Sequence, residues 1–405
     1  MGNLSGKKLL FIAGGEEQIV TIKWAAEQGV NVFVVDINEN ALGFQYAQAT
    51  MSCDIKDKER ILNFAKKHSI DGVTTICLES SMHTFAYLVE ELGLTGENLE
   101  TIENVTNKFN MRKIFKKAGL ATPEFQFVMP ELLRDSEFPG FDGPWVVKPV
   151  DSAGSRGVIF VDAQEKITTA YHNALAFSGI GKVMIEQYIP GKEISVEGFV
   201  INGELIVELL SDKHRSSLPY LFDTDIYYPS RYSPEIQKEA IRQTRIAIKA
   251  LGIKNGPVHE ELMVTPDENI FIVEIAGRGP GSKIYTEIIP HVSGIYPDRL
   301  QVMHSLGCLP AKIVRKSPLK GATIWWFGSQ QRARIKKFVG IEKVKDVPDV
   351  FECRMYKKEG EIVNKCISGE GRIGQLITMS ETLENAIEAQ KIALETFRIE
   401  LNVLN

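Results

Sequence analysis

At 405 residues the chain is longer than one ordinary hydrophobic core supports, so two or three domains are expected. Hydrophobic residues make up 44% and charged residues 24%, as in ordinary globular proteins. The 47 basic and 52 acidic residues give a formal net charge of −5, which argues against nucleic acid or a membrane surface as a partner. The first residues have neither a signal-peptide pattern nor an apolar span, and the cysteines form no C-x-x-C pair. We therefore expect a cytoplasmic protein with reduced thiols.

The first hundred residues alternate between short apolar runs and amphipathic stretches. These patterns predict strand 8–13, helix 17–28, strand 31–35, helix 58–68, strand 72–77 and helix 81–92. Strand–helix–strand units of this length predict a doubly wound parallel sheet. Gly14-Gly15 and the later Asp36 also occur in dinucleotide-binding folds, but the glycine spacing here differs. Because Glu16 and Glu17 would also repel a pyrophosphate, a dehydrogenase is disfavoured.

From residue 123 the pattern changes to strands joined by turns. The predicted strands cover 145–149, 157–161, 182–187, 193–201, 204–210, 258–264 and 270–275, with helices at 235–251 and 383–400. Asn202-Gly203 is typical of a two-residue hairpin turn. Consecutive strands joined in this way predict antiparallel sheets, so the chain combines an α/β part with an α+β part.

Two glutamates lie on the predicted hairpin 258–275. A turn centred between Asp267 and Glu268 places Glu261 directly opposite Glu274, with Cβ atoms ~5 Å apart. Alternation along the strands leaves both glutamates and His259 on one face. The other face is apolar and is expected in the core; it consists of Leu262, Val264, Phe271, Val273 and Ile275. Opposed like charges need neutralisation, so the pair predicts a divalent cation such as Mg²⁺, with a lysine partner or solvent as the alternative.

Two cationic residues carry the chemistry of phosphate binding. Arg278 lies four positions after Glu274, where a fixed guanidinium would stabilise a phosphoryl-transfer or acyl-phosphate transition state; a surface arginine is the alternative. Lys148 ends a predicted buried strand before a small, flexible loop. The loop residues that would let backbone N–H groups approach a phosphate are Ser152, Gly154, Ser155 and Gly157. The loop matches neither the Walker nor the G-x-G-x-x-G pattern.

A third segment runs from Glu186 to Glu193. A strand that ends in one glutamate, followed by a short crossover and a second glutamate, can border a purine pocket. One carboxylate would then face the amine region of adenine, and the other would face the ribose hydroxyls. Charged residues at strand ends are also often merely solvated, so this segment is weak evidence by itself.

In this order the three segments resemble the ATP-grasp superfamily, over residues 104–281. The resemblance implies an N-terminal doubly wound parallel-sheet domain at 1–107. It implies an ATP-grasp fold at 108–310, with a small lid at about 122–190 and a larger antiparallel-sheet domain. A C-terminal subdomain at 311–405 is expected to pack on that core. The lid, and above all its loop 152–157, is expected to close over the nucleotide.

The resemblance also implies a role for individual residues. Those expected to bind the nucleotide are Lys108, Lys148, Ser152, Gly154, Ser155, Gly157, Glu186, Gln187, Tyr188, Ile189, Glu193 and Lys213. Glu261 and Glu274 are expected to hold Mg²⁺ or Mn²⁺, and Lys148 and Arg278 to act in catalysis. ATP and the divalent metal are the implied cofactors.

Several motifs are similar to the amino-acid (dipeptide-forming) ligase branch. They are Gly-Pro-Val-His-x-Glu261, Glu274-x-Ala-x-Arg278 and the run 211–230. Two departures weaken the transfer of substrate identity: Asp223 and Ile226 stand where many dipeptide ligases have Glu and His, and a small Gly-Pro-Gly-Ser run replaces a bulky residue. Purine-pathway ligases such as phosphoribosylglycinamide synthetase share the architecture and stay open. A non-catalytic nucleotide-binding module is the further alternative.

The expected reaction activates a carboxylate as an acyl-phosphate with ATP, couples it to an amine and releases ADP and phosphate. The partners are then small-molecule acids and amines, and a homodimer is expected by analogy. The candidate substrate residues are Glu79, Asp223, His259 and Arg278. Glu79 follows a strand of the parallel sheet, at the edge where ligands of open α/β sheets bind; a helix N-terminal glutamate is the alternative reading.

Overall fold

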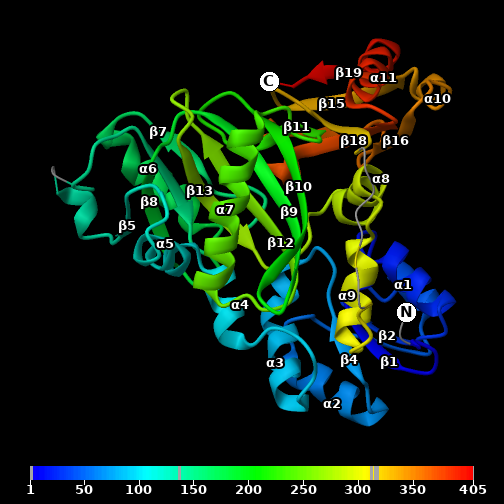
Figure 1. The fold of residues 1–405 in the computed structure, drawn as a ribbon. Helices are drawn as coiled ribbons and strands as arrows, with labels where there is room; N and C mark the ends of the chain where they lie inside the picture. The colour runs from blue at the N-terminus through cyan, green and yellow to red at the C-terminus, as the bar shows by residue number, and fades with distance from the viewer. Residues whose placement is uncertain (1–2, 136–137, 311–312, 314–318, 405) are drawn as a thin grey trace.

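The computed structural model describes residues 3–135, 138–310, 313 and 319–404, and Figure 1 shows their arrangement. The chain begins with a parallel four-stranded sheet of order β3-β2-β1-β4. Its strands are β1 Lys8–Ile12, β2 Asn31–Asp36, β3 Ala49–Ser52 and β4 Gly72–Thr74. Its helices are α1 Ile19–Glu27, α2 Lys58–His68 and α3 Met82–Leu92. The predicted doubly wound parallel sheet is confirmed, while the short edge strand β3 was not predicted.

Helix α9 (Pro297–Ser305) packs back onto this sheet from much later in the chain. Gln301 Nε2 donates to the carbonyl oxygen of Thr75 at 2.8 Å. The hydroxyl of Thr21 on α1 donates to Asp298 Oδ2 at 2.9 Å. Because these bonds are buried, leaving either partner unmatched would be costly. They fix the N-terminal sheet against the rest of the chain.

A small antiparallel sheet of order β5-β8-β6-β7 follows two connecting helices. The elements are α4 Leu99–Thr106, α5 Lys108–Lys117, β5 Phe125–Val128, β6 Trp145–Pro149, β7 Ile159–Val161, α6 Ile167–Leu175 and β8 Val183–Gln187. Val147, Ile185 and Ala174 belong to a buried cluster that this sheet forms with α6. The sheet therefore has its own core, and it coincides with the segment expected to form a lid, whose movement stays a prediction.

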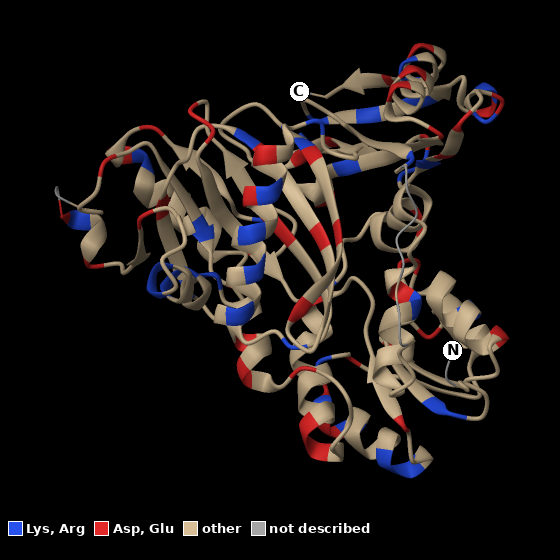
Figure 2. Ribbon diagram, in the orientation of Figure 1, with Lys and Arg blue, Asp and Glu red and all other residues tan. Residues whose placement is uncertain are grey.

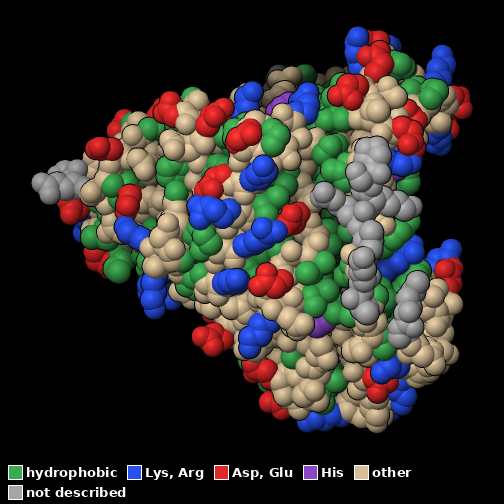
Figure 3. All heavy atoms as spheres, viewed as in Figure 1, with side chains coloured by type: hydrophobic (Ala, Val, Ile, Leu, Met, Phe, Trp, Pro, Cys, Tyr) green, Lys and Arg blue, Asp and Glu red, His purple; other side chains and the backbone are tan. Residues whose placement is uncertain are grey.

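The largest element is an eight-stranded antiparallel sheet of order β13-β12-β9-β10-β11-β14-β18-β16. Its strands are β9 Lys192–Ile201, β10 Glu204–Arg215, β11 Asp223–Tyr228, β12 Gly256–Val264, β13 Ile270–Ala276, β14 Gly321–Gly328, β16 Val350–Met355 and β18 Arg372–Ser380. Asn202 and Gly203 form the predicted hairpin turn between β9 and β10, with φ of 52° and 79°. Helix α7 (Pro234–Leu251) buries Ala240, Ala247 and Ile248 against the sheet. Its outer face carries acidic and basic side chains (Figures 2 and 3).

The C-terminal segment continues the same sheet, because β14 pairs with β11 through Ile324 and Ile226. The other elements after β13 are α8 Ile289–Ser293, β15 Ala333–Val339, α10 Ile341–Val344, β17 Ile362–Val363, α11 Leu383–Thr396 and β19 Arg398–Val403. The expected start of a C-terminal subdomain, residue 311, lies outside the described residues. None of the described helices has the length and apolar character needed to cross a membrane.

One predicted helix end was wrong. The helix expected at 383–400 ends at Thr396, and β19 follows it and pairs with β15. The last residues alternate between polar and apolar types, and Ile399 and Leu401 pack against a small apolar cluster that includes Ile335. The period-two pattern and its strand partner outweigh the helical tendency of the preceding residues.

Glu260 on β12 has a fully buried carboxyl group, to which the hydroxyl of Thr244 on α7 donates a hydrogen bond. Burial raises its pKa from 4.5 to about 8. The unfolded chain releases this proton near pH 4.5 and the folded protein only near pH 8, so stability is lost as the pH rises through that window. Glu260→Gln is therefore expected to raise the urea midpoint at pH 8 and to change it much less at pH 5. Glu388→Gln, exposed on α11, is the control; an equal pH dependence of Glu260→Gln and wild type would contradict the prediction.

Candidate active site

A cleft of about 600 Å³ lies where the N-terminal sheet, the small sheet and the eight-stranded sheet meet. Every predicted site residue except Gly157 and Glu193 lines it. The lining residues from the prediction are Glu79, Lys108, Lys148, Ser152, Gly154, Ser155, Glu186, Gln187, Tyr188, Ile189, Lys213, Asp223, His259, Glu261, Glu274 and Arg278. Gly157 has a φ of 72°, and a Cβ there would lie 3.2 Å from Ala174 Cα, so its place is structural. The tertiary fold thus brings together residues from three separate sheets.

Glu261 and Glu274 are directly opposed on β12 and β13, as predicted, but the register that achieves this differs from the prediction. The turn is centred on Asp267, because the N–H of Thr265 donates to the carbonyl oxygen of Asn269 at 2.9 Å. This shifts the pairing by one position along the outer half of the hairpin. A β-bulge at Val273 then restores the opposition of the two glutamates.

The bulge also changes which residues of β13 face the core. Phe271 and Val273 were expected there, and this was wrong: Ile270 and Ile272 are the buried residues, and Val273 lines the cleft. On the facing strand, Leu262 and Val264 are buried as predicted, as is Ile275 beyond the bulge. An extra residue in one strand reverses the face of every residue between it and the turn, and periodicity alone does not reveal it.

Each of the two opposed glutamates has a lysine partner. Lys213 Nζ lies 2.6 Å from Glu261 Oε1 and 2.6 Å from Glu193 Oε1, and 3.0 Å from Asp223 Oδ2. Lys108 Nζ lies 3.0 Å from Glu274 Oε1 and donates to the carbonyl oxygen of Ser152 at 2.8 Å. The carboxylates of Glu261 and Glu274 are about one-quarter and one-fifth exposed (24% and 19%), so both remain open to the cleft.

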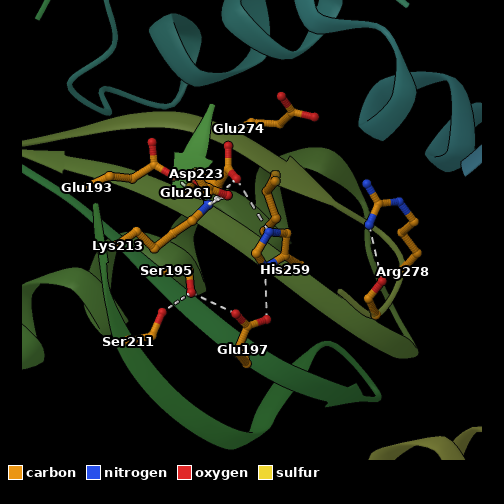
Figure 4. A network of polar contacts seen from close by, with 12 residues as sticks. Glu193, Ser195, Glu197, Ser211, Lys213, Asp223, His259, Glu261, Glu274 and Arg278 are labelled. Carbon is orange, nitrogen blue, oxygen red and sulfur yellow. Dashed lines mark hydrogen bonds and ion pairs between the residues drawn. The ribbon is translucent and has the colours of Figure 1, made fainter. Parts of the chain in front are cut away.

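Lys213 is the centre of an acidic cluster (Figure 4). Carboxylate oxygens of Glu193, Asp223 and Glu261 lie within 4.8 Å of one another, a spacing that also suits a metal ion. Burial opposes the charge on Lys213, but Asp223 and Glu261 outweigh burial and raise its pKa above the ordinary range. Glu193 is buried and forms an ion pair with Lys213. Its predicted contact with a ribose stays a prediction.

Lys148 is held by a buried ion-pair triad that the sequence did not predict. Glu186 lies between Lys148 Nζ and Arg112 Nε, at 2.6 Å from each. Burial lowers the pKa of Lys148 to about 8. Glu186 opposes this effect, and the positive charge of Arg112 adds to it. Lys108 and Arg112 are four residues apart on α5 and so lie on one face of the helix, which was the available signal. Both oxygens of Glu186 are engaged, so its predicted contact with adenine stays a prediction.

Arg278 is oriented by Glu79. Its Nε and Nη2 atoms lie 3.2 and 3.1 Å from Glu79 Oε2, and Nη1 donates to the carbonyl oxygen of Gly279 at 3.1 Å. Burial opposes the charge, but Glu79 and Glu274 outweigh burial and raise the pKa of Arg278. Glu79 stands at the end of the N-terminal sheet, so this pair joins two sheets across the cleft.

His259 lies beneath the glutamates (Figure 4). Its Nδ1 lies 2.8 Å from Glu197 Oε2 and its Nε2 lies 3.5 Å from Glu261 Oε1. Burial opposes protonation, but Glu197 outweighs it and raises the pKa of His259 to about 9. Glu197 also accepts hydrogen bonds from Ser195 and Tyr228 at 2.7 and 2.9 Å. A protonated His259 therefore helps to fix the carboxylate of Glu261.

Two family models match the chain: ATP-grasp domain over residues 141–287, and L-amino acid ligase C-terminal domain 2 over residues 325–402. The first match contains strands β6, β7 and β8 of the small sheet, the loop after Lys148, both opposed glutamates and Arg278. The chain contains an ATP-grasp domain. The superfamily predicted from the sequence is thereby confirmed.

The relatives that the chain resembles differ in their activities. A formate-dependent phosphoribosylglycinamide formyltransferase of Prochlorococcus marinus (strain MIT 9515) is 28% identical over 45% of this chain and 48% of its own length. An alanine–anticapsin ligase of Bacillus subtilis (strain 168) is 23% identical over 62% of this chain and 56% of its own length. The matched region thus spans about half the length of these two relatives.

A crystal structure of L-amino acid ligase from Bacillus licheniformis has the same fold as this chain. The TM-score is 0.84 at 22% identity, over 99% of this chain and 100% of the other. At this identity the likeness establishes the fold. The expected order of a parallel-sheet domain, a small sheet and a larger antiparallel sheet is therefore confirmed.

The C-terminal segment also contributes to the ATP-grasp cleft, and the sequence did not predict this. The residues that line it are Trp326 on β14, Arg372 on β18 and Gly369, which precedes β18. The N–H of Gly369 donates to the carbonyl oxygen of Gly154 at 3.3 Å, so the predicted phosphate loop touches this segment. None of these residues stands in a motif, because their place depends on how β14 and β18 extend the central sheet.

Proposed function

We propose that the protein is an ATP-dependent ligase that joins a carboxylate to an amine and releases ADP and phosphate. The observation that carries the proposal is the convergence of Lys148, Arg278 and the opposed pair Glu261–Glu274 on one cleft. This set combines cations that bind phosphate with carboxylates that bind a hard metal ion. A binding module that only holds a nucleotide has less need of a guanidinium oriented like that of Arg278.

In the proposed reaction an oxygen of the acid attacks the terminal phosphorus of ATP, and ADP leaves. The amine nitrogen then attacks the acyl carbon, phosphate leaves and the amine releases a proton. Lys148 and Arg278 would stabilise the negative charge that develops on the transferred group. Cys77 lines the cleft, but burial raises its pKa well above the ordinary range, which makes it a poor nucleophile. The proposed reaction therefore proceeds without a covalent enzyme intermediate.

The residues fit a divalent cation. Glu261 and Glu274 offer oxygen ligands from adjacent strands, and both are open to the cleft. These two carboxylates would hold Mg²⁺ or Mn²⁺, which supplies positive charge to the phosphates when bound. The lysine partners Lys108 and Lys213 keep the carboxylates neutralised and in place.

The proposal is tested by phosphate release with ATP-Mg²⁺ and a matrix of acids and amines. Release is expected only when an acid and an amine are both present, with ADP and the coupled product in equal amounts. Formation of AMP and pyrophosphate would rule out an acyl-phosphate intermediate. A strict requirement for a phosphorylated ribosyl amine would favour the purine-pathway alternative, which the Prochlorococcus relative keeps open. The expected homodimer is tested separately by light scattering.

ATP binding is expected to weaken as the pH rises through about 8, the pKa to which burial lowers Lys148. Only the protonated lysine attracts phosphate oxygens, so the apparent Kd varies inversely with the protonated fraction and should increase about tenfold between pH 7 and 9. Calorimetric titration with ADP or a non-hydrolysable ATP analogue measures this without turnover. In Lys148→Arg the decline should move out of the range, because a guanidinium stays charged. A similar decline in both proteins would rule out Lys148 as its source.

A further inference from the structure

Arg372 is a partly buried cation of the cleft that pairs with no carboxylate of the described residues. Among the described residues, the buried or half-buried cations that line the cleft pair with carboxylates, and Arg372 is the exception. Arg156 and Arg215 also have carboxylate partners, Glu370 and Glu193 respectively. A cation in a protein interior without a counter-ion is costly, so its position calls for an explanation.

The donors of Arg372 are only partly used. Its Nη2 donates to the carbonyl oxygen of Asp223 at 3.0 Å, while its Nε has no hydrogen-bond acceptor among the described residues. The guanidinium carbon lies 3.7 Å from the centre of the Trp326 ring. The indole N–H of Trp326, which is 7% exposed, also lacks an acceptor within the described part of the chain. Two adjacent side chains of the cleft thus each have an N–H donor without an acceptor among the described residues, the Nε of Arg372 and the indole N–H of Trp326.

Electrostatics supports the same reading. Burial lowers the pKa of Arg372, and the nearby Asp223 does not compensate for it. Asp223 directs its carboxylate to Lys213 at 3.0 Å and only its carbonyl to Arg372, so it does not neutralise the guanidinium. An anion that enters the cleft would supply both the missing charge and the missing acceptors.

We propose that Arg372, stacked on Trp326, binds an anionic group of the amine substrate. The inference rests on the proposed function, because it assigns part of that same site. The reacting carboxylate becomes an acyl-phosphate and then an uncharged amide, so it does not keep its charge through the reaction. A permanent cation such as Arg372 is better matched to a second anion that the reaction leaves unchanged. That anion belongs to the amine: the α-carboxylate of an amino acid or the phosphate of a phosphorylated amine. Both present oxygens in a plane or fork that a guanidinium matches.

The substrate arm of the test compares three amines at saturating ATP-Mg²⁺ with the acid that gives the fastest phosphate release. L-Alanine carries a carboxylate, O-phosphoethanolamine carries a phosphate, and L-alaninamide is L-alanine with the carboxylate replaced by an uncharged amide. Wild type is expected to prefer one of the anionic amines, and which one distinguishes a carboxylate site from a phosphate site. Arg372→Met should raise the KM of that amine roughly 10- to 100-fold and leave the KM values of L-alaninamide and ATP unchanged. Arg372→Lys should fall between the two.

A stability arm separates this role from a structural one. Arg372→Met removes a poorly compensated charge, so the melting temperature without ligand should be unchanged or higher. Were Arg372 a structural residue, the loss of its stacking on Trp326 would lower it. Arg354→Met on the neighbouring strand β16, outside the cleft, is the matched control and should leave the amine preference intact.

The same proteins tell failure of this inference from failure of the proposed function. If wild type releases no amine-dependent phosphate, the ligase proposal fails, and calorimetric titration of the three amines in the presence of ADP takes its place. Weaker binding of an anionic amine to Arg372→Met would still support the anion site. Equal affinity of wild type for anionic and neutral amines, or unchanged affinities in Arg372→Met, would overturn it.

Discussion

Lys148→Met is expected to lower kcat/KM for ATP ~100- to 1,000-fold. The change removes a buried ammonium that lines the same cleft as the predicted phosphate loop. The fold should persist, because Arg112 lies 2.6 Å from Glu186 and keeps this buried carboxylate paired after Lys148 is gone. Removing both partners would leave an uncompensated charge, so Arg112→Met with Lys148→Met should be far less stable than either single variant.

Steady-state kinetics together with thermal denaturation checks this expectation. Lys182→Met serves as the control, since Lys182 is exposed next to β8 and does not line the cleft. Near wild-type activity of Lys148→Met would mean that the phosphates bind elsewhere. A large drop in melting temperature together with the loss of activity would instead point to a mainly structural ion-pair triad.

Arg278→Lys is expected to lower kcat ~100-fold with little change in the KM for ATP. The lysine keeps the positive charge but loses the planar fork, whose Nε and Nη2 both contact Glu79 at 3.2 and 3.1 Å. Because the developing charge lies on the transferred phosphoryl group, the loss should fall on the chemical step rather than on nucleotide binding. Arg242→Lys, on the outer face of α7, is the control.

Glu79→Gln, alone and with Arg278→Lys, resolves the role of Glu79. If Glu79 acts only by orienting Arg278, the effects on kcat should not add in the double variant. If Glu79 instead holds the cationic amine of an amino-acid substrate, its KM should rise independently of Arg278. Additive effects with an unchanged substrate KM would exclude both roles.

The hairpin that carries Glu261 and Glu274 illustrates how far sequence reasoning reaches. Their opposition was predicted correctly, yet the turn is centred on Asp267 and not between Asp267 and Glu268. The bulge at Val273 compensates for this shift in register. Alternation of polar and apolar residues sets the face of each strand segment. It does not locate an extra residue, because a bulge is stabilised by the strands on either side and not by its own sequence.

The ion pairs of the site show the opposite limit. Each of Lys108, Lys148 and Arg278 was predicted to be a site residue, but none of their ion-pair partners was predicted. Local spacing places a charge at a strand end or on a helix face, whereas its partner comes from another element: β8 for Lys148, β13 for Lys108 and the segment after β4 for Arg278. The partner is therefore decided when these elements pack together, since only then are the charges removed from water.

The sequence by itself determined the order of the elements, the superfamily and most of the charged residues of the cleft, because strand and helix periods and short motifs are local properties of the chain. The tertiary structure alone decided that Arg112 braces Glu186 and that Glu79 orients Arg278. It also decided that Arg372 reaches the cleft from the far end of the chain. These contacts depend on the packing of elements that are distant in sequence, and a buried charge acquires its partner, or its need for one, only when that packing excludes water.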